Sequence, residues 1–346
     1  MMRTRPIIVG IVGDSAAGKT TMTRGLVNIL GPDRVAHVCT DDYHRYDRAE
    51  RARMPFTALH PDCNYMDIME LQVERLHYGQ PILKPVYDHA TGCLVRPEYV
   101  VPREFVIVEG LLGFSTPVLR QFFDIKVYLD PPEPLRYEWK INRDTTKRGY
   151  TREQVLAELA KREKESAEFI RPQREFADIV VRFDKSKGGT HIEPPFDARL
   201  VLRPTLPHPD LTYLVERGHT AERAIRLTLA RDAGRPVDFL EVDGHVEDEH
   251  MLELEQVIQA HLPDEPLLEV GHHGEYVEGG VTRRSNSLAL TQLLLTYHVL
   301  RLYRDVVDVP FAPAIAAMER LKIMRPFNIS APLAAQAVPS LAESRL

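Results

Sequence analysis

Residues 6–21 of the 346-residue chain, with the sequence PIIVGIVGDSAAGKTT, decide the fold. The apolar run 6–12 is rich in β-branched residues and predicts a strand buried on both faces, as in a parallel sheet. Residues 13–20 match the pattern G-x-x-x-x-G-K-[ST] in full and lie between this strand and a helix expected over 21–30. A strand, a glycine-containing loop and a helix in this order predict a phosphate-binding loop, because backbone N–H groups at a helix N-terminus bind phosphate oxygens.

This loop predicts binding of ATP or GTP together with Mg²⁺. We expect Lys19 to reach the β- and γ-phosphates and the Thr20 hydroxyl to ligate the metal. The predicted nucleotide-binding residues are Gly13, Asp14, Ser15, Ala16, Ala17, Gly18, Lys19, Thr20 and Thr21. The pattern does not identify the group that accepts the phosphate.

Strands and helices alternate over residues 1–184, which predicts a three-layer α/β/α fold with a mainly parallel sheet. Further strands are expected over 34–39, 105–108, 125–129 and 179–183, and helices over 65–78, 134–148 and 151–170. A linker rich in glycine and proline follows at 185–195. Beyond it we expect antiparallel strands over 198–202, 211–216, 224–229 and 237–242, and helices over 251–261 and 287–307. The chain therefore divides into a P-loop core, residues 1–190, and an antiparallel region, residues 191–346, that completes the sheet.

Charge and composition exclude several classes of protein. The net charge of −6 argues against a general nucleic-acid coat and against a membrane-surface binder. Ten of the 44 basic residues are lysine and 34 are arginine, whose planar guanidinium group matches phosphate oxygens. No secretory signal or membrane-spanning run is evident, so we expect a cytoplasmic protein. Three cysteines without a CxxC pair form neither a disulfide framework nor a structural zinc site.

Carboxylates follow two of the predicted parallel strands. Glu109 ends the strand at 105–108, the Walker B arrangement that places an acid beside the metal and the γ-phosphate. Asp41 and Asp42 follow the strand at 34–39, where strand ends converge on the ligand crevice, and an aspartate there can take a proton from an acceptor hydroxyl. His44 and Arg48 are candidates for binding an anionic acceptor. The alternative is that the aspartates cap a helix and that Arg48 is solvated.

The helix expected over 134–148 carries a basic face. Lys140, Arg143, Asp144, Lys147 and Arg148 are spaced so that they share one side of the helix. Four cations with one carboxylate suit a phosphorylated acceptor and Mg²⁺, whereas the ordinary interpretation of such a run is a solvated, salt-bridged surface. Arg162, on the next helix, fits either interpretation.

Several segments resemble one known family. Together with the P-loop, the sequence resembles the phosphoribulokinase/uridine kinase family of P-loop small-molecule kinases. The segments are 41–48 (DDYHRYDR), 84–92 (KPVYDHATG), 106–110 (VIVEG), 139–149 (WKINRDTTKRG) and 169–178 (FIRPQREFAD). Within the family the chain is most similar to the long chloroplast and cyanobacterial branch, because of the spacing in 139–149, the segment 239–244 (FLEVDG), and residues 279–303. The resemblance covers roughly residues 5–305 and is more specific in the first half.

The resemblance implies a P-loop NTPase fold and ATP-dependent phosphorylation of the 1-hydroxyl of D-ribulose 5-phosphate, a reaction of the Calvin cycle. It implies Asp41 as the catalytic base, with Asp42 as the alternative, and Glu109 and Asp144 as residues that assist Mg²⁺. Lys19, Lys140 and Arg143 would stabilise the transferring phosphoryl group. The sugar phosphate would be held by His44, Arg48, Tyr87, His89, Arg148 and Arg162. Family members also suggest a homodimer built through the C-terminal region.

Two other functions remain open. A kinase of the same fold acting on uridine or on another sugar phosphate is one alternative, although the basic helix face favours a phosphorylated acceptor over a nucleoside. A nucleotide-binding regulator that has lost catalysis is the other, but Lys19, Thr20, Asp41, Glu109 and Asp144 are all present.

The cysteines depart from the family pattern. Light-regulated relatives carry a redox-active cysteine inside the P-loop, where this chain has Ala17. Cys39 occupies the position of its partner, and no cysteine follows Cys93. Thioredoxin-type regulation is therefore not expected.

Overall fold

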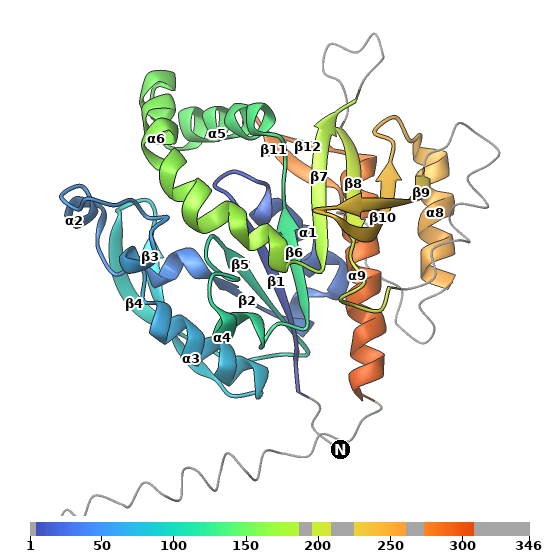
Figure 1. Ribbon diagram of the computed structural model, residues 1–346, viewed down its shortest axis with the longest axis horizontal. Helices are drawn as coiled ribbons and strands as arrows, with labels where there is room; N and C mark the ends of the chain where they lie inside the picture. Colours follow the sequence, from blue (N-terminus) through green and yellow to red (C-terminus); the bar gives the residue numbers. More distant parts are fainter. Residues whose placement is uncertain (1–4, 187–195, 209–224, 261–272, 308–346) are drawn as a thin grey trace, which may run out of the picture.

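The computed structural model describes residues 5–186, 196–208, 225–260 and 273–307 (Figure 1). An eight-stranded sheet lies at its centre, with the strand order β2-β5-β1-β6-β7-β8-β10-β9. Its strands are β1 (Ile7–Gly13), β2 (Val35–Cys39), β5 (Phe105–Gly110), β6 (Ile125–Leu129), β7 (Ile179–Lys185), β8 (Phe196–Leu202), β9 (Ile225–Asp232) and β10 (Arg235–Val242). The five strands from β2 to β7 in this order are parallel, and β8, β10 and β9 continue the sheet in antiparallel pairing.

Helices cover both faces of the sheet, which confirms the predicted three-layer α/β/α fold. One face packs against α1 (Lys19–Leu30), α8 (Asp248–Ala260) and α9 (Asn286–Val307). The opposite face packs against α3 (Met66–His77) and the short α4 (Pro117–Arg120). Every residue of β1 is buried between these layers, as its unbroken apolar sequence predicts.

Two further helices, α5 (Glu133–Lys147) and α6 (Arg152–Glu165), lie together beyond the carboxyl ends of the parallel strands (Figure 1). A π-helical turn, Ser166–Ile170, and a 3₁₀ helix, Arg171–Phe176, follow α6. The helix expected over 151–170 is therefore too long by one turn, because the regular hydrogen-bond pattern ends at Glu165. The remaining short helices are α2 (Arg48–Arg51) and the 3₁₀ turns Pro32–Arg34, Thr40–Tyr43 and Pro61–Cys63.

The structure contains two hairpins that periodicity does not predict. They are β3 (Ile82–Asp88) with β4 (Cys93–Val100), and β11 (Glu275–Glu278) with β12 (Val281–Arg284). Seven of the eight residues of β4 are exposed, so no apolar alternation marks that strand. The other predicted strands and helices are present, with ends that move by a few residues. The strand expected over 211–216 and most of the linker lie outside the described residues, while β7 pairs with β8 across that linker.

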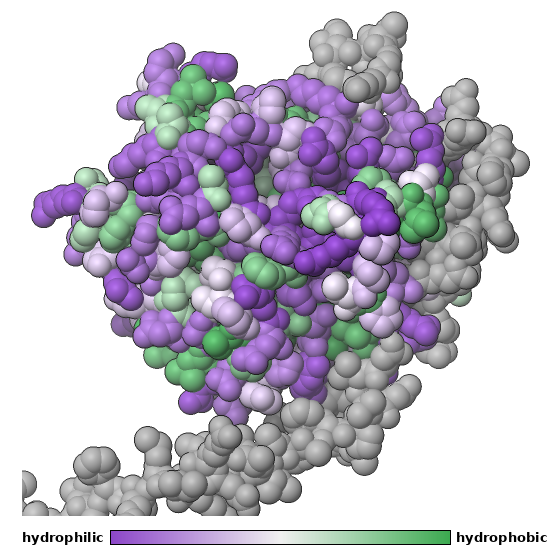
Figure 2. Space-filling model, in the orientation of Figure 1, coloured by the Kyte–Doolittle hydropathy of each residue, from purple (hydrophilic) through white to green (hydrophobic). Residues whose placement is uncertain are grey.

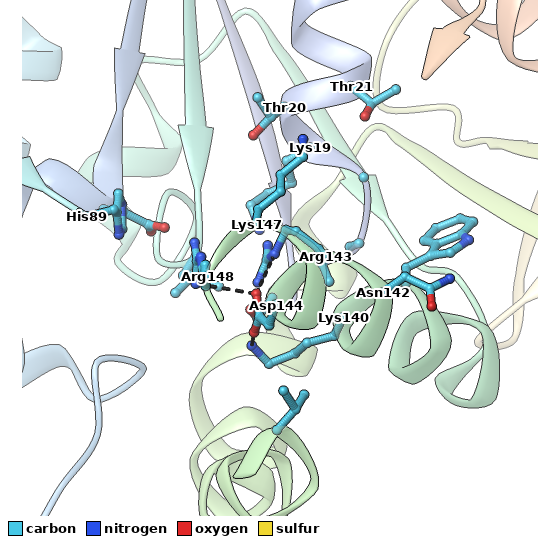
Figure 3. A pocket seen from close by; sticks show the side chains of 18 of the residues that line it. Lys19, Thr20, Thr21, His89, Lys140, Asn142, Arg143, Asp144, Lys147 and Arg148 are labelled. Atoms are coloured by element: carbon cyan, nitrogen blue, oxygen red, sulfur yellow. Dashed lines mark hydrogen bonds and ion pairs between the residues drawn. The ribbon is translucent and has the colours of Figure 1, made fainter. Parts of the chain in front are cut away.

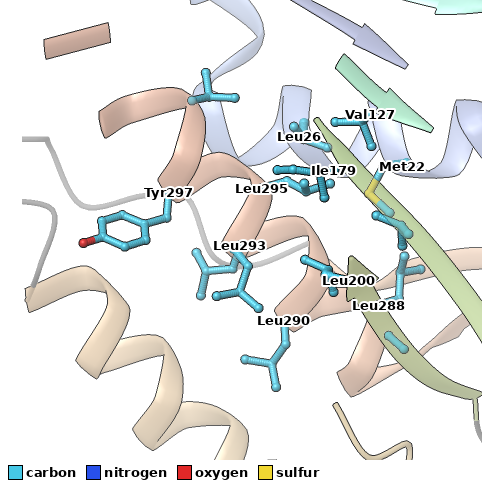
Figure 4. Close-up of a cluster of buried hydrophobic side chains, with 14 of the residues drawn as sticks. Met22, Leu26, Val127, Ile179, Leu200, Leu288, Leu290, Leu293, Leu295 and Tyr297 are labelled. Carbon is cyan, nitrogen blue, oxygen red and sulfur yellow. The ribbon is translucent and has the colours of Figure 1, made fainter. Parts of the chain in front are cut away.

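Helix α9 packs beside α1 on the same face of the sheet, where it contacts β1, β8 and β10 (Figure 4). Leu290, Leu293 and Leu295 are almost fully buried, and buried polar side chains lie among them. Gln292 is one of these: it donates to the Thr21 carbonyl on α1 and accepts from the Gly274 N–H. None of the described helices is long and apolar enough to cross a membrane, and hydrophilic side chains dominate the face in Figure 2.

The contact between α1 and α9 predicts the effect of one substitution. A Cβ atom at Gly25 would lie 2.0 Å from Cδ of the buried Gln292, so Gly25→Ala forces these helices apart or breaks both hydrogen bonds of the amide. We expect the free energy of unfolding in urea to fall by about 1–3 kcal/mol. Helix propensity alone predicts a gain of about 1 kcal/mol for the same change, so a more stable Gly25→Ala protein would contradict the close packing.

Candidate active site

A cavity of about 800 Å³ opens at the carboxyl ends of the parallel strands. Its walls come from the P-loop, the end of β5, the turn after β2, helices α5 and α6, and the β11–β12 hairpin. Figure 3 shows the side chains of the P-loop and of α5 facing each other across it. Strand ends, a helix N-terminus and a cationic helix therefore meet at one place.

The P-loop has the geometry of a phosphate cradle. Gly18 adopts φ 94° immediately before α1, and Ala16 is also in the left-handed region, with φ 65°. The Lys19 ammonium folds back and donates to the carbonyls of Gly13 and Asp14, at 2.9 and 3.0 Å. Residues 15–21 line the cavity. By contrast, Gly13 lies against the β6 backbone and the Asp14 side chain is buried outside the cavity.

Glu109 is held beside the P-loop by hydroxyl groups of α1. Its carboxylate accepts from the Thr20 hydroxyl at 3.3 Å and from the Thr23 hydroxyl at 3.1 Å, and Nε2 of His37 lies 3.2 Å away. One hydroxyl and one carboxylate at the start of the phosphate-binding helix fit the oxygen-ligand chemistry of Mg²⁺. Sequence reasoning missed Thr23 and His37. Thr23 follows Thr20 by three residues on one helix face, which is a signal that could have found it.

Asp41 and Asp42 have different surroundings. Asp42 forms an ion pair with the buried ammonium of Lys84 and accepts from the Tyr87 N–H at 3.0 Å. The Asp41 carboxylate lines the cavity and forms no hydrogen bond or ion pair within the described part of the chain. Only one of the two candidate bases thus has free oxygen atoms facing the cavity.

His44 is buried and neutral. Its Nδ1 lies 2.8 Å from Oδ1 of Asn64, whose amide nitrogen donates to two backbone carbonyls, so the imidazole donates from Nδ1 and keeps a lone pair on Nε2. Burial, aided by the charge of Arg51, lowers the pKa of His44 to about 4 despite the nearby Asp41. The ring is therefore uncharged at neutral pH, so any contact of His44 with an acceptor uses the Nε2 lone pair and not a positive charge.

Three cations of the α5 region converge on Asp144 (Figure 3). The Lys140 ammonium and Nε of Arg143 lie 2.7 and 2.8 Å from its two oxygens, and Nη1 of Arg148 lies 3.6 Å away. Burial disfavours ionisation of Asp144, but the hydrogen bonds from Arg143 and Lys140 outweigh it and lower the pKa to about 2. Burial lowers the pKa of Lys140 to about 8. Both oxygens of Asp144 thus contact cations, and its expected role beside Mg²⁺ stays a prediction.

The acceptor end of the cavity is cationic. The predicted sugar-phosphate residues that line it are His44, Arg48, Tyr87, His89, Arg148 and Arg162. Three further cations, Arg51, Lys147 and Lys161, also line the cavity. Sequence reasoning missed Arg51 and Lys161, and it placed Lys147 on the basic helix face without giving it a role. Arg51 donates to the Tyr87 hydroxyl at 2.6 Å, and Arg162 pairs with Glu158 at 3.0 Å.

The other end of the cavity is aromatic. The rings of Trp139 and Phe196 lie 5.6 Å apart, and those of Phe196 and Tyr276 lie 6.3 Å apart. All three side chains line the cavity next to the P-loop. Such a surface suits a flat nucleobase, as the polar end suits phosphates.

The sequence of this chain is similar to the sequences of several known kinases. Residues 8–187 match the model of the phosphoribulokinase/uridine kinase family. The chain belongs to this family. The phosphoribulokinase of Synechocystis sp. is 31% identical over 336 residues, which cover 90% of this chain and 98% of the relative. The uridine kinase of Chloroflexus aurantiacus is 36% identical over 185 residues, which cover 52% of this chain and 88% of the relative.

A solved member of the phosphoribulokinase/uridine kinase family shares the fold. The phosphoribulokinase from Rhodobacter spheroides superposes with a TM-score of 0.55 at 20% identity. The superposition covers 74% of this chain and 97% of that structure. At this identity the similarity establishes the fold alone.

The three cysteines are not paired with one another. Cys39, Cys63 and Cys93 are all free thiols. Cys39 lines the cavity, and burial together with the charges of Asp41 and Glu109 raises the pKa of its thiol well above the ordinary value. A thiol that remains protonated is a poor nucleophile for disulfide exchange.

Proposed function

We propose that this protein transfers the γ-phosphate of ATP to the 1-hydroxyl of D-ribulose 5-phosphate, giving ribulose 1,5-bisphosphate and ADP. The observation that carries the proposal is the cationic end of the cavity, where Arg48, Arg51, Arg148 and Arg162 face a P-loop. An acceptor that already carries a phosphate needs these guanidinium groups, and a nucleoside does not. The similarity to a phosphoribulokinase over 90% of the chain supports the same reaction.

Asp41 acts as the base in this proposal. Its free carboxylate takes the proton of the 1-hydroxyl as that oxygen attacks the γ-phosphorus and the bond to the β-phosphate oxygen breaks. Asp42 is unsuited to this step because Lys84 and the Tyr87 N–H occupy its oxygens. The Nε2 lone pair of His44 accepts a hydrogen bond from a sugar hydroxyl and thereby orients the acceptor.

Cations neutralise the charge on the transferring group. Lys19, Lys140 and Arg143 line the cavity between the P-loop and the acceptor end. Mg²⁺, when bound, would be held by Thr20 and Glu109 and would neutralise charge on the β- and γ-phosphates. Phosphoryl transfer depends on positioning and electrostatic stabilisation more than on covalent chemistry, so this arrangement supports the proposed reaction.

The second candidate is a kinase of the same fold that acts on another sugar phosphate. The cation-rich acceptor end favours it over a nucleoside kinase, because the guanidinium groups recognise phosphate and not a particular sugar. A catalytically silent regulator is disfavoured by the free Asp41 carboxylate, which such a protein does not need.

Turnover with different acceptors tests the proposed reaction. We expect ADP release with Mg-ATP to be fastest with ribulose 5-phosphate, slower with other sugar phosphates and absent with uridine. Asp41→Asn should lower kcat by about 10²–10⁴-fold with little change in KM, because it removes the proton acceptor. Best turnover with uridine or with a different sugar phosphate would refute the proposed acceptor.

Asp42→Asn is the matched control for the base. It leaves the buried Lys84 ammonium with only the exposed Glu98 carboxylate, 3.6 Å away, so we expect a loss of stability of about 3–5 kcal/mol, measured by urea unfolding. The folded fraction should retain most of its turnover. If Asp42→Asn abolishes turnover in folded protein while Asp41→Asn does not, the two roles are reversed.

The lowered pKa of Lys140 predicts a pH profile. The ammonium is charged below its pKa of about 8 and loses its charge as the pH rises through that value. If this charge stabilises the transferring phosphate, kcat/KM for ATP falls by about tenfold per pH unit above pH 8. Lys140→Arg should abolish this inflection, because a guanidinium stays protonated; an unchanged inflection in Lys140→Arg would assign it to another group.

We also propose that the protein is a homodimer. Within the described residues β9 pairs only with β10, so its outer edge offers backbone groups for another strand. Leu229 on this strand is 82% exposed. Sedimentation velocity should give twice the 39.5 kDa chain mass, and Leu229→Lys should shift the equilibrium toward the monomer. A wild-type monomer at micromolar concentration would refute the dimer.

We also propose that no thiol switch regulates the activity of this protein. We further propose that the protein is cytoplasmic. Burial keeps the Cys39 thiol protonated, and the chain has Ala17 at the P-loop position where light-regulated relatives carry the second cysteine. We expect the same turnover after treatment with reduced or oxidised dithiothreitol. A reversible loss of activity on oxidation that Cys39→Ser abolishes would establish a thiol switch.

A further inference from the structure

Three buried polar side chains outside the cavity join the P-loop to the two helices at its mouth. Asp14 belongs to the loop, Arg136 to the first turn of α5, and Ser166 to the π-helical turn after α6. Their exposed fractions are 6%, 6% and 3%. None of them lines the cavity. We call these three residues the Asp14 cluster.

The Asp14 cluster holds the P-loop backbone from a small pocket beside the cavity. The Asp14 carboxylate accepts from the Ser15 N–H at 2.6 Å and from the Ser166 hydroxyl. Nη1 of Arg136 lies 3.3 Å from both the Asp14 carboxylate and the Ser15 carbonyl oxygen, to which it donates. Both polar groups of the Ser15 backbone are thus restrained immediately before Ala16, whose left-handed conformation is unfavourable for a residue with a side chain.

The same contacts set the distance between the P-loop and the catalytic cations. Arg136, Lys140 and Asp144 follow one another at intervals of four residues and therefore share one face of α5. Lys140 lies about 6 Å along the helix axis from Arg136, at a rise of about 1.5 Å per residue. A helix fixed to the loop at Arg136 thereby holds the Lys140 ammonium at one distance from the bound phosphates.

Helix α6 is restrained at the same end of the cavity. Ser166 lies four residues after Arg162, which lines the acceptor end. The neighbouring Glu165 accepts from the Thr57 N–H at 2.9 Å, and Thr57 also lines the cavity. The helix that carries Arg162 is therefore attached both to the phosphate donor loop and to the acceptor wall.

We propose that the Asp14 cluster positions α5 and α6 against the P-loop for phosphoryl transfer, and that Arg136 is its central positioning residue. Arg136 does not touch the substrates. It acts by placing Lys140 and Arg143 where the phosphate passes from donor to acceptor. This inference rests on the proposed kinase activity.

Arg136→Met tests the proposal in the full chain. We expect kcat to fall by about 10–100-fold, the loss typical of misplaced catalytic groups, while the Kd for Mg-ADP changes by less than about threefold. The single tryptophan of the chain, Trp139, lines the cavity and reports nucleotide binding by fluorescence. Hydrogen exchange of the amides at 15–18 should become faster, and Arg136→Lys should recover part of kcat.

Two further variants separate positioning from stability. Arg136→Met leaves the Asp14 carboxylate buried without its cation, so Asp14→Asn combined with Arg136→Met should recover the unfolding temperature but not kcat. Glu138→Gln is the matched control on α5, because Glu138 pairs with the exposed Lys185 and lies outside the cavity. We expect it to leave kcat and exchange unchanged.

The outcomes are distinct. Wild-type kcat in folded Arg136→Met, or recovery of kcat together with stability in the double variant, overturns the positioning role. If the wild-type protein turns over none of the sugar phosphates, the proposed function fails, and the exchange experiment with bound Mg-ADP then decides the inference alone. An unchanged rate of hydrogen exchange at the amides of residues 15–18 in Arg136→Met would overturn the positioning role of Arg136.

Discussion

Like charges repel most strongly where water is excluded, so a protein can gather several cations in a cavity only if an anion lies among them. Asp144 is that anion. It is ionised at any ordinary pH because Arg143 and Lys140 hydrogen-bond to it, and it compensates only one of the three positive charges around it. The remaining charge is local, because the chain as a whole carries −6. Phosphate groups are the ligands that complete this balance.

The parallel sheet explains why residues far apart in sequence meet here. Glu109 on β5 lies level with Ile11 on β1 and with Cys39 on β2. The three strands therefore end at one height, and the chain segments that follow them converge. The P-loop begins at the end of β1, and Asp41 comes two residues after the end of β2. The P-loop, Glu109 and Asp41 are thus brought together by strand register, before any side-chain interaction is considered.

Much of this arrangement is predictable from the sequence. The P-loop, the buried strands and the acids at their ends follow from local patterns, because a strand buried on both faces has an unbroken apolar run. The basic face of α5 follows from helical spacing. Patterns of this kind describe one segment at a time, and the order of the segments along the chain then predicts the three-layer fold.

The features that could not be predicted depend on pairs of segments. The uncharged state of His44 follows from its burial and from the charge of Arg51, and its tautomer follows from Asn64, twenty residues away. The different surroundings of Asp41 and Asp42 depend on Lys84, which lies on a hairpin whose second strand is exposed and gives no periodic signal. The contacts of Asp144 with three cations show that it balances their charge, which its helical spacing alone does not establish. Likewise, the sequence gives no sign that Arg136 differs from other helix arginines, because its contact with Asp14 forms only in the folded protein.

Helix α9 has a consequence for how the protein is made. It covers the apolar residues of α1 and of the sheet face behind the P-loop, yet it begins more than 250 residues after α1 does. When the ribosome has synthesised the P-loop, Asp41, Glu109 and Asp144, it has not yet synthesised α9, which covers the apolar core behind these residues. The nascent nucleotide-binding half therefore carries an uncovered apolar face through most of translation, and such surfaces are those that chaperones bind. In this protein the last step of core formation joins the two ends of a long stretch of chain.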